Sequence, residues 1–256
     1  MTSEKIFLGE KNDIPFMEFF KNDSKQKLPA VIIFPGGGYA HRAKHEAEPI
    51  AQEFLREGFH AFVVQYRVAP HKYPAPFIDA VNAIQYIRQN AEQLLTIPDK
   101  IAVCGFSAGG HLAAATAFFE GSEYPELSAS IMAKSRPNAV ILSYAVISFL
   151  QYVNEGTMKN LLGEENPSDK LREKFSWEKQ VTPSSPPVFL WHTADDAVVH
   201  VKNALLMASA LSENSVPFEM HIFPHGKHGL GLAKDDLRIS QWLPLAASWL
   251  RQTFSK

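Results

Sequence analysis

The sequence has only one cysteine, Cys104, among its 256 residues, so no intrachain disulfide can form. Cys104 lies in an apolar run, and we expect it to be a small buried core residue. No apolar run is long enough to span a membrane, and no signal-like apolar segment follows the polar first residues. We therefore expect a cytoplasmic protein without a membrane partner.

The sequence also has little excess charge of either sign. Its formal net charge is −2 at pH 7, and Lys and Arg are scattered rather than clustered. A nucleic-acid partner is therefore not expected. A homo-oligomer is compatible with this composition but is not indicated by it. With 46% hydrophobic and 20% charged residues, the chain suits one globular α/β domain spanning residues 1–256.

Apolar runs with strand character alternate with segments of helical periodicity. Strands are expected at 4–8, 16–20, 30–34, 60–66, 139–144, 187–192 and 218–223, with another beginning at Ile101. Helices are expected at 46–56, 78–90, 112–119, 201–211 and 239–254. This order predicts a mainly parallel, eight-stranded sheet with helices on both faces. The first two strands, joined by a polar turn at 11–13, should form an antiparallel edge. We expect residues 145–182 to be irregular and to form a small cap or insertion.

The strand that begins at Ile101 leads into a G-x-S-x-G turn at 105–109, and an alanine-rich helix follows. Such a turn presents its serine on a strained backbone at the end of a strand. Glycine at both flanking positions lets the strand and the helix pass closely. Ser107 is therefore the expected nucleophile, and the N–H of Ala108 is an expected oxyanion donor. The alternative is an ordinary glycine-rich turn.

A serine nucleophile needs a base and an acid that orients the base, and the sequence offers two candidates for each. Asp195 and Asp196 follow the strand at 187–192, and His225 and His228 follow the strand at 218–223. We expect Asp196 and His228 to act. Asp195 would then cap its turn, and His225 would pack within its loop.

Three glycines at 36–38 follow the strand at 30–34. We expect Gly37 and Gly38 to complete the oxyanion hole with their N–H groups. A phosphate loop is excluded, because neither G-K-[ST] nor G-x-G-x-x-G follows, whereas a purely structural glycine turn remains open. Tyr39 either lines the acyl pocket or packs in the core.

Other polar and aromatic residues carry weaker signals. His111 is expected to be a packing residue, and Trp177 either roofs the site or covers the sheet. His41 and His45 have the spacing of metal ligands, but no H-E-x-x-H pattern or cysteine pair accompanies them. No metal or cofactor is therefore expected.

Together, these motifs resemble the small bacterial esterases of the α/β-hydrolase superfamily that are related to acetyl xylan and feruloyl esterases. These esterases are similar in turn to the hormone-sensitive-lipase group, whose signature is H-G-G-G. The resemblance runs from about residue 28 to the C-terminus and rests on five stretches: Pro35-Gly36-Gly37-Gly38-Tyr39, Tyr66-Arg67-Val68-Ala69-Pro70, Gly105 to Leu112, Asp196 with Val198-Val199, and His225-Gly226-Lys227-His228-Gly229.

The resemblance implies an α/β-hydrolase fold and hydrolysis of short acyl esters, with O-acetyl groups on sugars as candidate substrates. It implies a catalytic triad in which Ser107 is the nucleophile, Asp196 the acid and His228 the base. It also implies three oxyanion donors, the N–H groups of Ala108, Gly37 and Gly38. The sequence departs from the family at three positions. Pro35 replaces the histidine of H-G-G-G, Lys227 replaces a small residue, and His200 replaces a proline.

Three other functions remain open. A peptidase of the prolyl-oligopeptidase type shares the triad positions, but it normally adds a propeller domain for which this chain has no room. An amide hydrolase such as an arylformamidase would use the same residues. A catalytically silent binding module on the same fold would not need all three triad residues.

Overall fold

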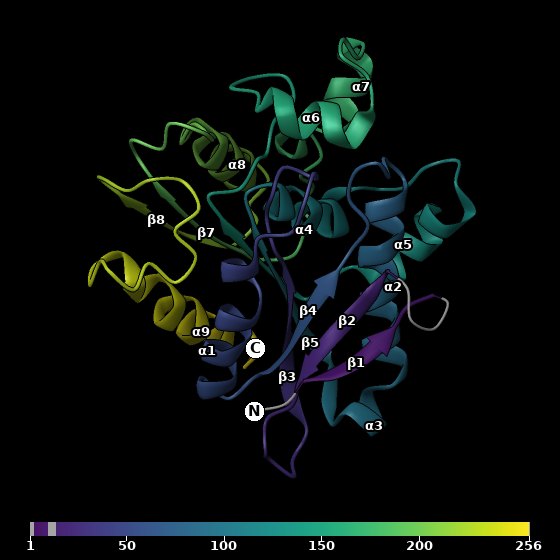
Figure 1. Cartoon of the computed structure of the whole chain (residues 1–256), viewed down its shortest axis with the longest axis vertical. Coiled ribbons are helices and arrows are strands. Elements are labelled where there is room, and N and C mark those ends of the chain that lie inside the picture. The colour runs from purple at the N-terminus through teal and green to yellow at the C-terminus, as the bar shows by residue number, and fades with distance from the viewer. Residues whose placement is uncertain (1–2, 10–13, 256) are drawn as a thin grey trace.

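The computed structural model of the chain describes residues 3–9 and 14–255, so the turn expected at 11–13 lies outside the described residues. One eight-stranded sheet runs through the molecule in the order β1-β2-β4-β3-β5-β6-β7-β8 (Figure 1). The strands are β1 (Glu4–Phe7), β2 (Phe16–Phe20), β3 (Leu28–Phe34), β4 (His60–Gln65), β5 (Thr96–Phe106), β6 (Ala139–Ser143), β7 (Val188–Thr193) and β8 (Phe218–Phe223). From β4 to β8 the neighbours are parallel, whereas β1 and β2 form an antiparallel edge. The predicted sheet is confirmed.

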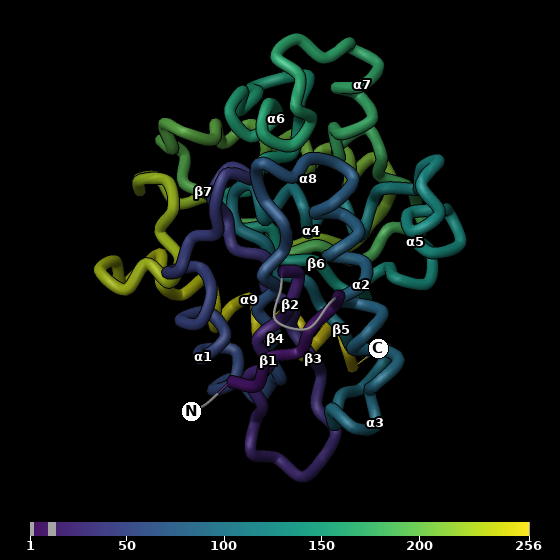
Figure 2. Tube along the Cα trace, turned by 45° about the vertical axis from the view of Figure 1, so that its right-hand side comes forward, coloured from purple at the N-terminus to yellow at the C-terminus, as the bar shows by residue number. Residues whose placement is uncertain are grey.

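Helices cover both faces of the sheet, as predicted. One face packs against α1 (Glu48–Arg56) and α9 (Trp242–Thr253). The other packs against α2 (Ala75–Gln89), α4 (Ala108–Phe118) and α8 (Lys202–Glu213), with the short α3 (Ala91–Leu94) and α5 (Ala129–Ser135) at its margin. Figures 1 and 2 show these two layers on either side of the strands. Within the described part of the chain, no helix is long and apolar enough to cross a membrane.

All five predicted helices begin one to four residues away from the predicted starts, and proline explains the shifts of α1 and α2. Pro49 lies in the first turn of α1, which begins at Glu48 after a separate 3-10 turn, η1 (Lys44–Glu46). Pro76 lies in the first turn of α2, which begins at Ala75. Proline is favoured in the first helical turn, because the N–H that it lacks has no partner there.

The expectation that residues 145–182 are irregular is wrong. They contain α6 (Glu155–Leu162), α7 (Asp169–Lys174) and a 3-10 turn, η3 (Trp177–Lys179). Side chains cap both helices, since Asn154 accepts from the N–H of Thr157 and Ser168 accepts from that of Leu171. Both helices are short and carry few apolar residues, so their periodicity is weak. In Figures 1 and 2 they lie beyond α4, at one end of the molecule.

The Tyr66-Arg67 pair that follows β4 has a structural role. The Arg67 guanidinium donates to Asp79 on α2 at 2.6 Å, and the Arg67 backbone N–H donates to the same buried carboxylate at 2.7 Å. The buried Tyr66 hydroxyl donates to the carbonyl of Pro35 at 2.6 Å. These bonds attach the loop after β4 to α2 and to the glycine loop after β3.

Candidate active site

The turn between β5 and α4 has the strained geometry that was predicted. Ser107 lies between the two elements with φ 52° and ψ −118°. A Cβ atom at Gly105 would lie 2.2 Å from the carbonyl oxygen of Gly109, and one at Gly109 would lie 2.1 Å from that of Phe34. Neither position can hold a side chain, so the two glycines allow the close approach of strand and helix.

Three of the predicted site residues meet at the carboxyl edge of the sheet. Nε2 of His228 lies 2.8 Å from Oγ of Ser107, and Nδ1 of His228 lies 2.7 Å from Oδ2 of Asp196. Ser107 is 8% exposed, and the His228 side chain is 15% exposed. The serine, the imidazole and the carboxylate therefore form one hydrogen-bonded line, in which the imidazole is the most exposed group and the carboxylate is fully buried.

Asp196 is held as a carboxylate. Burial alone would raise its pKa, but hydrogen bonds from His192, from His228 and from the backbone N–H groups of Val199 and Val198 hold that pKa well below its usual range. An ionised Asp196 accepts the Nδ1–H of His228, which leaves Nε2 as the acceptor for the Ser107 hydroxyl. The arrangement can therefore remove a proton from the serine.

His192 is a further site residue, which the sequence pattern does not indicate. It is fully buried at the end of β7, where its Nε2 lies 2.8 Å from the carbonyl of Val199 and 3.3 Å from Oδ2 of Asp196. Both neighbours are acceptors, so Nε2 carries the proton, and it faces the same carboxylate oxygen, Oδ2 of Asp196, that binds His228. In the sequence, His192 is one more residue of a buried strand, so its spacing gave no signal.

A second Asp–His pair lies beside the first. Oδ2 of Asp195 is 2.9 Å from Nδ1 of His225, and Oδ1 accepts the N–H of Gly226 at 2.8 Å. Asp195 thus closes the turn, as expected. The expectation that His225 packs in its loop is wrong, because its side chain is 85% exposed. Within the described residues, the side chain that accepts the Ser107 hydroxyl proton is the imidazole of His228 and not that of His225.

The glycine loop after β3 has a defined pattern of backbone bonds. The N–H of Gly36 donates to Glu46, the carbonyl of Gly37 accepts from Ala40 at 2.9 Å, and that of Gly38 accepts from the Asn160 amide at 2.8 Å. Among the residues that the structure describes, no acceptor is bound to the N–H groups of Gly37, Gly38 or Ala108. All three N–H groups remain available to an oxygen of a substrate.

The Tyr39 side chain does not line the site. It is fully buried, and its hydroxyl lies 3.0 Å from Nδ1 of His111. Nε2 of His111 lies 3.0 Å from the carbonyl of Phe175, so His111 is the packing residue that was predicted. Trp177 is also fully buried, 4.8 Å from the His111 ring, and therefore packs in the core over α4 and does not roof the site.

His111 should make the fold sensitive to acid. Burial lowers its pKa from 6.5 to about 3, so between these values the unfolded chain binds a proton that the folded chain excludes. Stability should therefore fall as the pH decreases through this range, by about 1.4 kcal/mol per pH unit from this residue. Urea unfolding between about pH 4.5 and pH 7 measures the slope. We expect a shallower slope for His111→Gln, and equal slopes would contradict this account.

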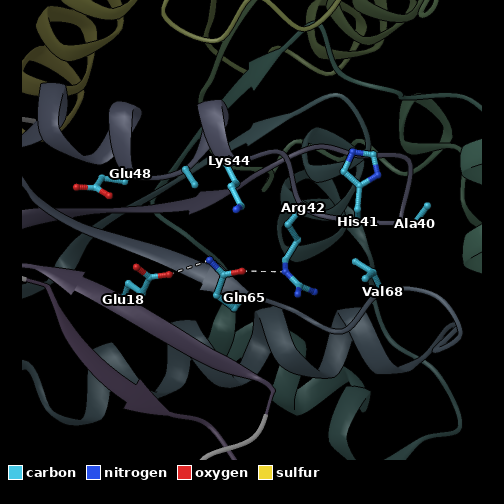
Figure 3. Close-up of a pocket in the computed structure, with 9 residues that line it drawn as sticks. Glu18, Ala40, His41, Arg42, Lys44, Glu48, Gln65 and Val68 are labelled. Carbon is cyan, nitrogen blue, oxygen red and sulfur yellow. Dashed lines mark hydrogen bonds between the residues drawn. The ribbon is translucent and has the colours of Figure 1, made fainter.

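A pocket of about 520 Å³ lies beside the glycine loop, between η1 and the strands β2 and β4 (Figure 3). Arg42 donates to Gln65 at 2.8 Å, and Gln65 donates to Glu18 at 2.9 Å, so one wall is a fixed polar chain. Ser107 is not among the residues that line this pocket: Glu18, Ala40, His41, Arg42, Lys44, Ala47, Glu48, Gln65 and Val68.

Two of the departures from the family pattern lie at the surface. Lys227 is exposed and lines a surface pocket with His45 and Gly229. His200 is exposed and accepts the N–H of Lys202 at the start of α8, and its ring lies tilted by 36° against that of Tyr152 with ring centroids 4.9 Å apart. His200 thus helps to cap α8, and neither side chain forms a hydrogen bond with Ser107, Asp196 or His228 within the described residues.

The family model that matches this chain is BD-FAE, and it covers residues 17–211. The chain belongs to the BD-FAE family. A crystal structure of an acetyl ester-xyloside bifunctional hydrolase from Caldicellulosiruptor lactoaceticus superposes with a TM-score of 0.88 and 42% identity, covering 98% of this chain and 96% of the other. The predicted family resemblance and the α/β-hydrolase fold are confirmed.

Two relatives are longer than this chain. It is 37% identical over 241 residues to the endo-1,4-beta-xylanase B of Butyrivibrio fibrisolvens, an alignment that covers 90% of this chain and 36% of the relative. It is 29% identical over 227 residues to an acetylxylan esterase of Xylanibacter ruminicola, which covers 87% of this chain and 45% of the relative. The chain thus spans less than half the length of these relatives. Of these two relatives, the second is the one named as an esterase.

Proposed function

We propose that this chain is a serine ester hydrolase that removes short acyl groups through an acyl-enzyme on Ser107. The observation that carries the proposal is the position of His228 between the two other residues. Its Nε2 lies 2.8 Å from Oγ of Ser107, and its Nδ1 lies 2.7 Å from Oδ2 of Asp196. The N–H groups of Ala108, Gly37 and Gly38, which have no acceptor within residues 3–9 and 14–255, support the same reaction, because a tetrahedral intermediate needs donors for its oxygen.

In the first step, Oγ of Ser107 attacks the ester carbonyl while Nε2 of His228 takes the hydroxyl proton. Asp196 stabilises the imidazolium that forms, and the N–H groups of Ala108, Gly37 and Gly38 bind the oxyanion. The imidazolium then protonates the departing alcohol as the C–O bond breaks. Water, deprotonated by His228, attacks the acyl-enzyme in the same way and releases the carboxylic acid and the free serine.

We propose an acetylated sugar as the substrate and residues 145–182 as a small cap of this single-domain enzyme. The sugar-ester hydrolase and acetylxylan esterase names among the relatives support this substrate class. The position of α6 supports short acyl groups, because a Cβ atom at Gly38 would lie 3.9 Å from Oγ1 of Thr157 and 4.0 Å from Nδ2 of Asn160. A long acyl chain would have to displace α6 from the oxyanion loop.

A panel of p-nitrophenyl esters from acetate to octanoate, together with acetylated xylose, tests the function. We expect the highest kcat/KM with acetate, a fall of at least about tenfold by octanoate, and acetate release from the sugar. A preference for octanoate would contradict the short-acyl assignment. Cleavage of an aryl formamide without cleavage of any ester would favour the amide hydrolase. A chain that neither cleaves any ester nor reacts with a fluorophosphonate would be a binding module.

A further inference from the structure

A buried carboxylate lies directly behind the proposed oxyanion hole. Glu46, at the end of η1, is 2% exposed. A Cβ atom built at Gly36 would lie 2.7 Å from Oε2 of Glu46 and 3.1 Å from Cβ of Ser107, so the carboxylate and the serine face the same point of the loop. A buried negative charge is costly unless its oxygens are bound, so its position beside the reacting groups requires an explanation.

Both oxygens of Glu46 are bound by elements of the site. Oε2 accepts the N–H of Gly36 at 2.7 Å, and Oε1 accepts the hydroxyl proton of Tyr144 at 2.7 Å. The Tyr144 oxygen in turn accepts the N–H of Gly231 at 2.8 Å. One carboxylate thus joins the oxyanion loop to the loop that carries His228, across the ends of β3, β6 and β8.

Tyr144 also contacts the proposed base directly. Its ring stands edge-on to the His228 ring, with centroids 5.0 Å apart. Burial and the neighbouring Glu46 carboxylate raise the pKa of Tyr144 well above its usual value, so its hydroxyl stays a neutral donor to Glu46. Tyr144 thus contacts both the Glu46 carboxylate and the His228 ring.

Few other charges lie near this network. Nε2 of His45 is 3.6 Å from Oε1 of Glu46 and is bound to the carbonyl of Gly229 at 2.9 Å. Among the described residues, the other titratable groups of this region are Tyr66 and Cys104 near Glu46, Asp196 and His192 beyond His228, and the exposed Lys227. No Lys or Arg forms an ion pair with Glu46 within the described residues.

We propose that Glu46 is a positioning residue of the esterase, which fixes Gly36 so that the next two N–H groups face the substrate oxygen and stabilises the positive charge on His228. The inference rests on the proposed function. Fixing the Gly36 peptide limits the orientations open to the peptides of Gly37 and Gly38, whose N–H groups have no acceptor among the described residues. A carboxylate near an imidazole favours the protonated form, which is the form that His228 takes in the transition state.

The test compares Glu46→Gln with Tyr144→Phe and with a matched control, Glu53→Gln, which removes a carboxylate that pairs with Arg56 at the surface of α1. We expect Glu46→Gln to lower kcat for p-nitrophenyl acetate by about 10- to 100-fold with little change in KM. We expect it to move the acid limb of kcat/KM to lower pH by about 0.3 to 1 unit. Glu53→Gln should match the wild type in both measurements.

Tyr144→Phe separates the two effects, because it keeps the carboxylate but breaks the link to the His228 loop. We expect kcat to fall by about fivefold while the acid limb does not move to lower pH. A folded Glu46→Gln variant with kcat within about twofold of wild type and an unmoved acid limb would overturn the proposal. If Glu46→Gln does not fold, an unchanged kcat in Tyr144→Phe would overturn it. If Ser107→Ala keeps its activity, the proposed function itself is wrong.

Discussion

Replacing Ser107 with alanine should reduce kcat/KM for p-nitrophenyl acetate by about 10,000-fold or more. The variant keeps the oxyanion donors and the Asp196–His228 pair but has no oxygen to form the acyl-enzyme. The fold should be unaffected, because the side-chain hydrogen bond recorded for the Ser107 hydroxyl is the one with His228. Steady-state kinetics on the purified variant, with its thermal unfolding measured in parallel, tests this expectation.

Ser209→Ala provides a control for the loss of a hydroxyl. Ser209 lies on α8, and its hydroxyl donates to Glu213 at the surface. We expect this variant to retain wild-type kinetics. A Ser107→Ala variant that folds normally and retains more than about a tenth of the activity would show that another nucleophile carries the reaction.

Asp196→Asn should lower kcat by about 10,000-fold, whereas Asp195→Asn should leave it within about threefold of wild type. Asparagine at 196 keeps the shape of the side chain but can present an N–H to Nδ1 of His228. The imidazole would then carry its proton on Nε2, facing Ser107, and could not accept the serine proton. In the described part of the chain, the Asp195 carboxylate bonds to the N–H of Gly226 in its turn and to the exposed His225, so its charge is not needed for this step.

The two Asp–His pairs lie in the same loops and have nearly equal N–O distances, 2.7 Å and 2.9 Å, so each variant is a matched control for the other. The same comparison applies to the histidines, where kcat should fall in His228→Gln and not in His225→Gln. If kcat fell equally in Asp195→Asn and Asp196→Asn, the loss would come from a disturbance of the two loops and not from the Asp196–His228 pair. A larger loss in Asp195→Asn would reverse the assignment of the acid.

The sheet and the positions of the main site residues could be predicted because they depend on local signals. Buried parallel strands are continuous apolar runs, and Ser107, Asp196 and His228 each follow the end of one. The flanking glycines of the turn were predictable for the same reason, since the close contact at Gly105 and Gly109 is set by the turn itself.

The polar groups that support the site could not be predicted, because their partners are distant in the sequence. Glu46 lies in a helical pattern that suggests an exposed carboxylate, yet its partner Tyr144 is 98 residues away. His192 follows the apolar run of β7 and contacts Asp196 only because the next turn folds back. The helices α6 and α7 were missed because short helices with side-chain caps carry little hydrophobic periodicity.

The central claim is that a nucleophilic oxygen on Ser107 is activated by His228, and covalent labelling tests it most directly. The wild-type enzyme is treated with a fluorophosphonate and digested, and the modified peptide is mapped by mass spectrometry. The account predicts one adduct per chain, on Ser107, which forms far more slowly in His228→Gln than in His225→Gln. An adduct on another residue, or equal labelling rates in these two variants, would contradict it.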